Sequence, residues 1–118
     1  MKLAANALLA IQVAGVAETL AALEKSGIAP KHALEIISGL PVTSPAGNGF
    51  AGLMVAGDFA PRFTAALIAK DLRYAVAEAA ENTTKVPVLQ AARDIFDELC
   101  AKGFGGENIS AAIKAYRG

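Results

Sequence analysis

Two polar residues near the amino end, Lys2 and Asn6, have types and a spacing that could do chemistry. They are four residues apart, so on a helix both side chains project from one face, one turn apart. An almost unbroken apolar run follows them. An ammonium group donates hydrogen bonds, and an amide both donates and accepts them, so the two together could contact a polar ligand. The pair therefore indicates either half of an active site or an accident of capping at the helix start.

A second lysine, Lys70, lies within a helical pattern that covers about residues 64–82. The apolar stripe of this pattern consists of Ile68, Leu72, Ala75, Val76 and Ala79. Lys70 is two residues, or about 200°, from Ile68, so it projects from the opposite face of the helix. It is either the solvated neighbour of Asp71 or a lysine directed at a partner domain.

The elements that must position these residues are all predicted to be helices. A long first helix is predicted from Lys2 to Lys25, ending before Gly27, and a short one from Pro30 to Ser38. After a loop at 39–49, predicted to be the longest irregular piece, we expect helices at 50–56, 64–82 and 87–102 and a last short one begun by Asn108 or Ser110. No segment alternates with period two. The sequence therefore predicts an all-α fold of about six helices packed around the long first helix.

Composition indicates one domain, residues 1–118, with a net charge of zero. Binding to nucleic acid or to an anionic membrane normally requires a basic excess, so we expect neither partner. Residues 3–23 are apolar enough for a membrane span, but Asn6, Gln12 and Glu18 favour a buried helix of a soluble protein. The single cysteine, Cys100, favours a reducing compartment, and we expect a cytoplasmic protein.

Other types of site find little support in the sequence. There is no glycine-rich phosphate loop after a strand, and no pair of Cys or His residues at metal-ligand spacing, so no metal is expected. His32 is predicted at the surface and Cys100 in the core. Ser44, Asn48 and Gly49 are either pocket-lining residues or ordinary loop residues.

Two motifs together carry a resemblance to a known family. They are K-L-A-A-N at the start of the long helix and F-x(6)-K-D, which runs from Phe63 to Asp71. With the segments G-I-A-P and D-F-A-P-R-F they resemble the C-terminal helical domain of the β-hydroxyacid dehydrogenases, which include 3-hydroxyisobutyrate dehydrogenase and tartronate semialdehyde reductase. The implied fold is similar to the C-terminal domain of 6-phosphogluconate dehydrogenase. The resemblance covers essentially the whole chain.

The resemblance implies a role for four residues. The lysine that matches Lys2 is the general acid/base on the substrate hydroxyl, and the asparagine that matches Asn6 binds the substrate, largely through its carboxylate. The lysine that matches Lys70 lies against the nicotinamide end of the cofactor, helped by the aromatic residue that matches Phe63. A lysine titrates near about 10.4 in water, so partial burial would have to lower its pKa before it could act as a base.

The family's other half is a Rossmann domain that binds NAD or NADP, and this chain does not contain it. The resemblance therefore implies the substrate-binding and catalytic domain of an NAD(P)-dependent 3-hydroxy acid dehydrogenase, inactive without its Rossmann partner. The implied substrate is a small 3-hydroxy acid or, in the reverse direction, a semialdehyde. Met1 is either a true start or an internal residue of a longer enzyme.

The alternative hypothesis is a free-standing helical interaction or oligomerisation domain without catalysis. It predicts that substitutions of Lys2 and Asn6 are tolerated. Both hypotheses predict a homo-oligomer, because a long Ala-rich helix separated from its neighbour exposes apolar surface.

Overall fold

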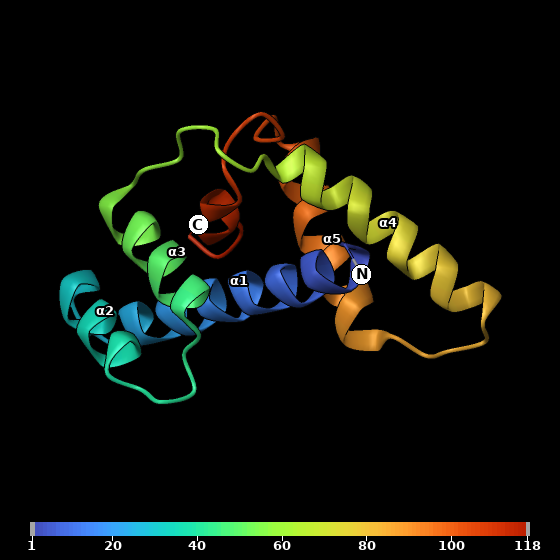
Figure 1. The fold of residues 1–118 in the computed structure, drawn as a ribbon. Coiled ribbons are helices and arrows are strands. Elements are labelled where there is room, and N and C mark those ends of the chain that lie inside the picture. The colour runs from blue at the N-terminus through green and yellow to red at the C-terminus, as the bar shows by residue number, and fades with distance from the viewer. Residues whose placement is uncertain (1, 118) are drawn as a thin grey trace.

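The computed structural model describes the backbone of residues 2–117 and the side chains of residues 3–117. Five α-helices and one 3-10 helix follow one another along this part of the chain. Its only β-type pairing is an isolated bridge between Thr64 and Asn108. The prediction of an all-α fold with about six helices is confirmed (Figure 1).

The first helix, α1 (Lys2–Lys25), has the predicted bounds. Its end is set by Gly27, whose φ of 100° is easily reached only by glycine. The amide of Gly27 donates to the carbonyl of Glu24, and the amide of Ile28 donates to that of Leu23, both at 3.1 Å. These two bonds satisfy carbonyls that the helix end would otherwise leave without a partner.

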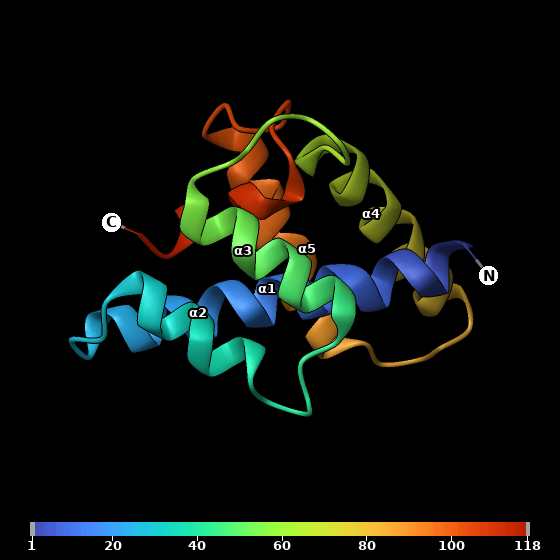
Figure 2. The same cartoon turned by 60° about the vertical axis from the view of Figure 1, so that its left-hand side comes forward.

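Helix α1 packs against every other element of the fold. In Figures 1 and 2 its amino end lies beside α4 (Ala65–Glu81) and α5 (Pro87–Ala101), and its carboxyl end lies beside α2 (Pro30–Ser38). Its core side is lined by fully buried small and medium side chains, among them Ala10, Val13, Ala17 and Leu20. The predicted central position of the long helix is therefore confirmed.

The prediction for the loop at 39–49 is partly wrong, because α3 (Pro45–Ala56) begins five residues earlier than expected. The Ser44 side chain caps this helix by accepting a hydrogen bond of 2.9 Å from the amide of Gly47. Pro45, at the first helical position, already has the φ that a helix requires. A cap followed by proline is a start signal, and here it outweighs the poor helix propensity of the three glycines in the segment.

The remaining elements agree with the predicted positions. Helix α4 is capped by Thr64, whose Oγ1 accepts from the amide of Leu67 at 3.3 Å, and α5 opens at Pro87. The last element, η1 (Ile109–Ala115), is a 3-10 helix that follows Asn108. The Asn108 side chain makes no capping bond with it, so its predicted role as a helix cap is wrong.

One side of α1 is uncovered, which departs from the prediction that apolar neighbours surround it. Leu8 is 60% exposed, and Gln12, Gly15 and Thr19 are also exposed. From Leu3 onward the helix is long and apolar enough to cross a membrane by length and composition, a test that core helices of soluble proteins also pass. Only 28% of its most apolar window is buried. Small and polar residues break the apolar surface on this side, so it offers little for the fold's own helices to bury.

Candidate active site

A pocket of about 370 Å³ lies where the amino-terminal part of α1 meets that of α4. Its wall combines α1, the segment that leads into α4, and the first turns of α4 itself. The lining residues are Asn6, Arg62, Phe63, Leu67, Lys70 and Asp71. Three of the four residues selected from the sequence thus line a single pocket, although they lie far apart in the chain.

The α4 side of the pocket is built by helical spacing. Phe63, Leu67 and Lys70 follow one another at intervals of four and three residues, so they lie on one side of the helix start. Ile68 and Leu72 lie on the other side and are fully buried. Burial of that stripe leaves Lys70 exposed and Leu67 51% exposed at the pocket. The prediction that Lys70 points away from the apolar stripe is confirmed.

The two helices are joined across the pocket by a side-chain hydrogen bond. Nδ2 of Asn6 donates to Oδ2 of Asp71 at 2.6 Å, in partly buried surroundings. An ionised carboxylate can only accept hydrogen bonds, so this contact fixes which end of the Asn6 amide faces α4. Hydrogen bonds to a charged group are stronger than neutral ones, and the Asn6 side chain is therefore held in one orientation.

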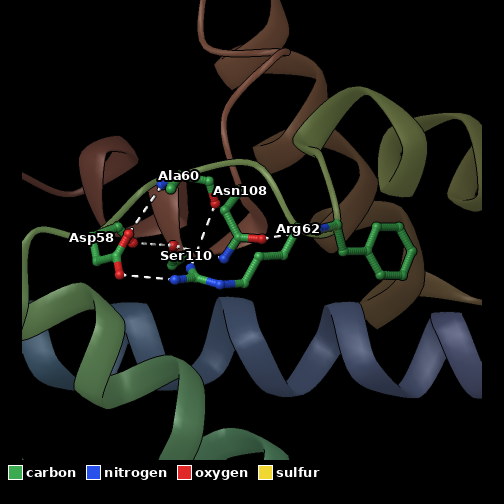
Figure 3. Close-up of polar contacts among 6 residues, drawn as sticks. Asp58, Ala60, Arg62, Asn108 and Ser110 are labelled. Carbon is green, nitrogen blue, oxygen red and sulfur yellow. Dashed lines mark hydrogen bonds and ion pairs between the residues drawn. The ribbon is translucent and has the colours of Figure 1, made fainter.

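The segment before α4 carries a short ion pair next to the pocket. Arg62 Nη2 lies 3.0 Å from Asp58 Oδ2, and the other carboxylate oxygen accepts from the amide of Ala60 at 3.2 Å (Figure 3). The hydrogen bond from Arg62, followed by that from Ala60, lowers the pKa of Asp58 below its ordinary value. Arg62 is thereby tied back to its own segment while it lines the pocket.

Lys2, the predicted general acid/base, is the first residue of α1 and precedes Asn6 by four residues. Its side chain lies outside the described residues. The backbone places it on the face of α1 that carries Asn6, since four residues are slightly more than one turn. Its catalytic role stays a prediction.

The loop residues considered from the sequence lie elsewhere. Ser44 lines a second hollow, of about 350 Å³, beside Gln12 and Thr19 of α1. Asn48 and Gly49 belong to α3 and are not among the residues that line the first pocket. The structure therefore does not bring these three residues to Asn6 and Lys70.

The first pocket combines charged, amide and apolar groups, and the carboxylate of Asp71 partly offsets its two cationic side chains. Lys70 and Arg62 supply positive charge, Asn6 supplies an amide, and Phe63 and Leu67 supply apolar surface. Among the described residues no group of three or more His, Cys, Asp or Glu side chains has an arrangement that could hold a metal ion. The pocket thus has the components for binding an organic acid or the nicotinamide end of a dinucleotide.

Comparison with known proteins agrees with the motifs and the fold. A family model described as "NAD-binding of NADP-dependent 3-hydroxyisobutyrate dehydrogenase" matches residues 1–116. The chain belongs to this dehydrogenase family. The resemblance drawn from Lys2, Asn6, Phe63 and Lys70 is thereby confirmed at the level of the family.

Two relatives of this chain have names that state an activity. The chain is 30% identical over 117 residues to glyoxylate/succinic semialdehyde reductase 1 of Arabidopsis thaliana, covering 99% of this chain and 40% of the relative. It is 32% identical over 122 aligned residues to 2-(hydroxymethyl)glutarate dehydrogenase of Eubacterium barkeri, covering 98% and 39%.

Solved structures in the family share the fold. The 3-hydroxyisobutyrate dehydrogenase of Salmonella typhimurium matches with a TM-score of 0.91 and 25% identity, over 96% of this chain and 40% of that one. The Mycobacterium tuberculosis enzyme, solved with L-serine, matches with a TM-score of 0.87 and 27% identity, over 99% and 42%. This chain therefore spans about two fifths of the length of its relatives.

Sequence reasoning overlooked Leu67 and two polar residues of the pocket. Asp71 stood beside Lys70 in the K-D motif without a role, and its bond to Asn6 joins residues 65 positions apart. Arg62 stood in the D-F-A-P-R-F segment. The only sequence signal for either residue was its place next to a selected one, since neither lies on an apolar stripe.

The bond between Asn6 and Asp71 is expected to stabilise the chain measurably. In urea unfolding of Asn6→Ala, Asp71→Ala and the double variant, we expect a coupling energy of about 1–2 kcal/mol, because the bond is partly buried and one partner is charged. The matched control pairs Asn6→Ala with Asp97→Ala, whose carboxylate bonds Arg73 instead. Effects of that pair should add within about 0.5 kcal/mol. Equal coupling in both pairs would show that the bond contributes nothing specific.

Proposed function

We propose that this chain is the substrate-binding and catalytic domain of an NAD(P)-dependent 3-hydroxy acid dehydrogenase. The observation that carries the proposal is the meeting of Asn6, Phe63 and Lys70 at one pocket, in a chain of this dehydrogenase family. Their positions in the sequence match the family motifs residue by residue. Glyoxylate, succinic semialdehyde, 3-hydroxyisobutyrate and 2-(hydroxymethyl)glutarate are the compounds to try first, since they appear in the names of relatives.

In this proposal the pocket residues divide between the two ligands. Asn6, held by Asp71, presents its amide to the substrate carboxylate. Lys70 and Phe63 lie against the nicotinamide end of NAD or NADP. The exposed ammonium of Lys70 suits a negatively charged group of the cofactor, and the aromatic ring of Phe63 suits its flat ring. The fit of this pocket to a dinucleotide rests on those two residues and on the apolar surface of Leu67.

The proposed reaction is the oxidation of a secondary or primary alcohol next to a carboxylate-bearing carbon chain. The dinucleotide, when bound, supplies the hydride acceptor. Lys2, as the free amine, takes the proton from the hydroxyl oxygen as the carbonyl forms, and returns it in the reverse reaction. Because a protonated lysine cannot accept that proton, oxidation should be favoured at high pH and reduction at lower pH.

The chain alone is not expected to turn over substrate, because in the family the dinucleotide is bound mainly by a separate Rossmann domain. The test begins with the source gene. A strand followed by G-x-G-x-x-G, encoded upstream in the same reading frame, supports the proposal. The longer protein, in which the domain encoded upstream is joined to this chain, is called the joined protein. It and the 118-residue chain are then assayed with each candidate acid and with NAD or NADP by the absorbance of the reduced cofactor.

We expect the joined protein to be active and the 118-residue chain alone to be inactive. A stop codon directly before Met1, or a joined protein inactive with all candidate acids, would contradict the proposal and favour an interaction domain.

We further infer self-association through the uncovered side of α1. Residues 5, 8, 12, 15, 19 and 22 are all exposed and follow one another at alternating intervals of three and four, the spacing of a helix-packing seam. Gly15 lies at the middle of this seam with no atom near the position of a Cβ. A glycine inside an exposed helix costs about 1 kcal/mol relative to alanine, which favours a role in close helix approach. Asn6 is nine residues from Gly15, about 180° around the helix, so a domain that completes the pocket leaves the seam free.

Replacing Gly15 with arginine is expected to weaken self-association at least about tenfold while leaving the fold intact. The new side chain meets open space in the single chain, and arginine is a better helix former than glycine. Sedimentation velocity over a range of concentrations measures the effect. Gly52→Arg on α3, which also meets open space, is the matched control and should associate normally. A monomeric wild-type chain would contradict the inference.

A further inference from the structure

The segment between α3 and α4, residues 57–64, brings Arg62 and Phe63 to the pocket but has no helix or strand of its own. It is held instead by residues near the carboxyl end. The amide of Asn108 donates to the Phe59 carbonyl at 3.0 Å, and the amide of Ile109 donates to the Phe63 carbonyl at 2.8 Å. A distant part of the chain therefore sets the course of this segment.

The Asn108 side chain adds a second set of bonds to the same segment. Its Oδ1 accepts from the amide of Phe63 at 3.0 Å, and its Nδ2 donates to Oγ of Ser110 at 3.0 Å. Ser110 Oγ in turn donates to the Asp58 carbonyl at 2.9 Å (Figure 3). Since a backbone amide can only donate, the bond from Phe63 fixes which end of the Asn108 amide is oxygen. The side chain thus holds the segment near both of its ends.

The two side chains of this network are buried, and their burial disfavours any arrangement in which their hydrogen bonds are broken. Asn108 and Ser110 are fully buried, and they are the only buried polar residues among the side chains that the structure describes. An asparagine before a helix ordinarily uses its side chain to cap that helix. Here it makes no cap bond with η1 and is directed to the pocket segment instead. A buried amide costs free energy unless its hydrogen bonds are made, so the side chain strongly disfavours other positions of the segment.

We propose that Asn108 is a positioning residue of the candidate active site: its bond to the Phe63 amide holds Phe63, and with it the neighbouring Arg62, where they line the pocket. The inference rests on the proposed function for its catalytic meaning. Asn108 itself is not among the residues that line the pocket, so it acts only through the segment.

The residue type matters because the backbone bonds remain when the side chain is removed. Asn108→Ala keeps the bonds to the Phe59 and Phe63 carbonyls and loses only the bond to the Phe63 amide and the support of Ser110. The expected change is a looser Phe63 in an otherwise folded chain. Ser110→Ala is the matched control, because it removes an equally buried side chain and two hydrogen bonds but leaves the bond to Phe63.

The first experiment uses the 118-residue chain and needs no catalysis. Amide hydrogen exchange is measured by NMR for wild type, Asn108→Ala and Ser110→Ala. In Asn108→Ala the Phe63 amide is expected to exchange at least about tenfold faster, while the backbone amides at positions 108 and 109 stay protected. In Ser110→Ala the Phe63 amide should keep its protection. An unchanged Phe63 amide in Asn108→Ala, or equal loss in both variants, would overturn the inference.

The second experiment uses the chain joined to its dinucleotide-binding half. Asn108→Ala is expected to raise the KM for NAD(P) about tenfold, with the KM for the acid and kcat within about twofold, because Phe63 is displaced and Asn6 is not. A general loss of packing would not separate the two KM values. Faster exchange at Phe63 with no change in the cofactor KM would also overturn the inference. Inactivity of the wild-type joined protein would instead refute the proposed function, and it is detected before any variant is made.

Discussion

Replacing Lys2 with alanine in the complete enzyme is expected to lower kcat by about 10²- to 10⁴-fold, the range that a positioned acid/base contributes. Among the described residues that line the pocket, none can take its place. Asn6 is an amide, Asp71 is engaged with it, and Arg62 is paired with Asp58. Lys70 lies on a different helix and is proposed to serve the cofactor. In the proposed mechanism, loss of Lys2 therefore removes the proton acceptor without a substitute.

The measurement separates this chemical effect from a structural one. Cofactor binding, followed by quenching of protein fluorescence or by calorimetry, should stay within about threefold of wild type, and circular dichroism should be unchanged. Lys25→Ala, at the other end of α1, is the matched control and should keep full activity. A Lys2→Ala enzyme with near-normal turnover would show that the assignment is wrong, even if the protein is a dehydrogenase.

The fold was predictable where local signals set the helix ends. Gly27, Pro30 and Pro87 mark boundaries that the structure reproduces, because a positive φ or a missing amide acts within one or two residues. The start of α3 was missed because three glycines concealed a valid signal, Ser44 followed by Pro45. Here the error came from weighing average propensity above a specific cap.

The candidate site was predictable only in part, for a different reason. Asn6 and Lys70 were identified through family motifs, while the contacts that hold the pocket join residues far apart in the chain. The bond from Asn6 to Asp71 spans 65 positions, and the bond from Phe63 to Asn108 spans 45. Periodicity reports which face of a helix is buried but does not report which residue of another helix lies opposite.

The exposed side of α1 shows a second limit of prediction from sequence, because here the sequence predicted more burial than the fold provides. Its apolar and small residues predicted burial on all sides, yet the fold covers only the side that carries Val13, Ala17 and Leu20. Composition alone cannot separate surface buried within one chain from surface that meets another. The structure shows open space around Gly15, and contact of this side with a second chain stays a proposal.

The second large effect concerns stability, and it involves a residue of the hydrophobic core rather than of the pocket. Phe96→Ala is expected to lower the free energy of unfolding by about 3–5 kcal/mol, the usual cost of removing a buried aromatic side chain. Phe96 is fully buried in the core cluster, on a helix that packs against α1, α4 and η1. A domain of this size is stable by only about 5–15 kcal/mol, so a single truncation removes a large part of the total.

Urea unfolding followed by circular dichroism measures this change, with Val88→Ala as the matched control. Val88 is on the same helix but is 61% exposed, so its truncation should change the free energy by less than about 0.5 kcal/mol. Similar losses for the two variants would contradict the packing assigned to α5. Because α5 packs against α1, α4 and η1, Phe96→Ala should also accelerate exchange across the chain, whereas Asn108→Ala should accelerate it at Phe63 alone. The comparison therefore separates residues that hold the fold from residues that shape the pocket.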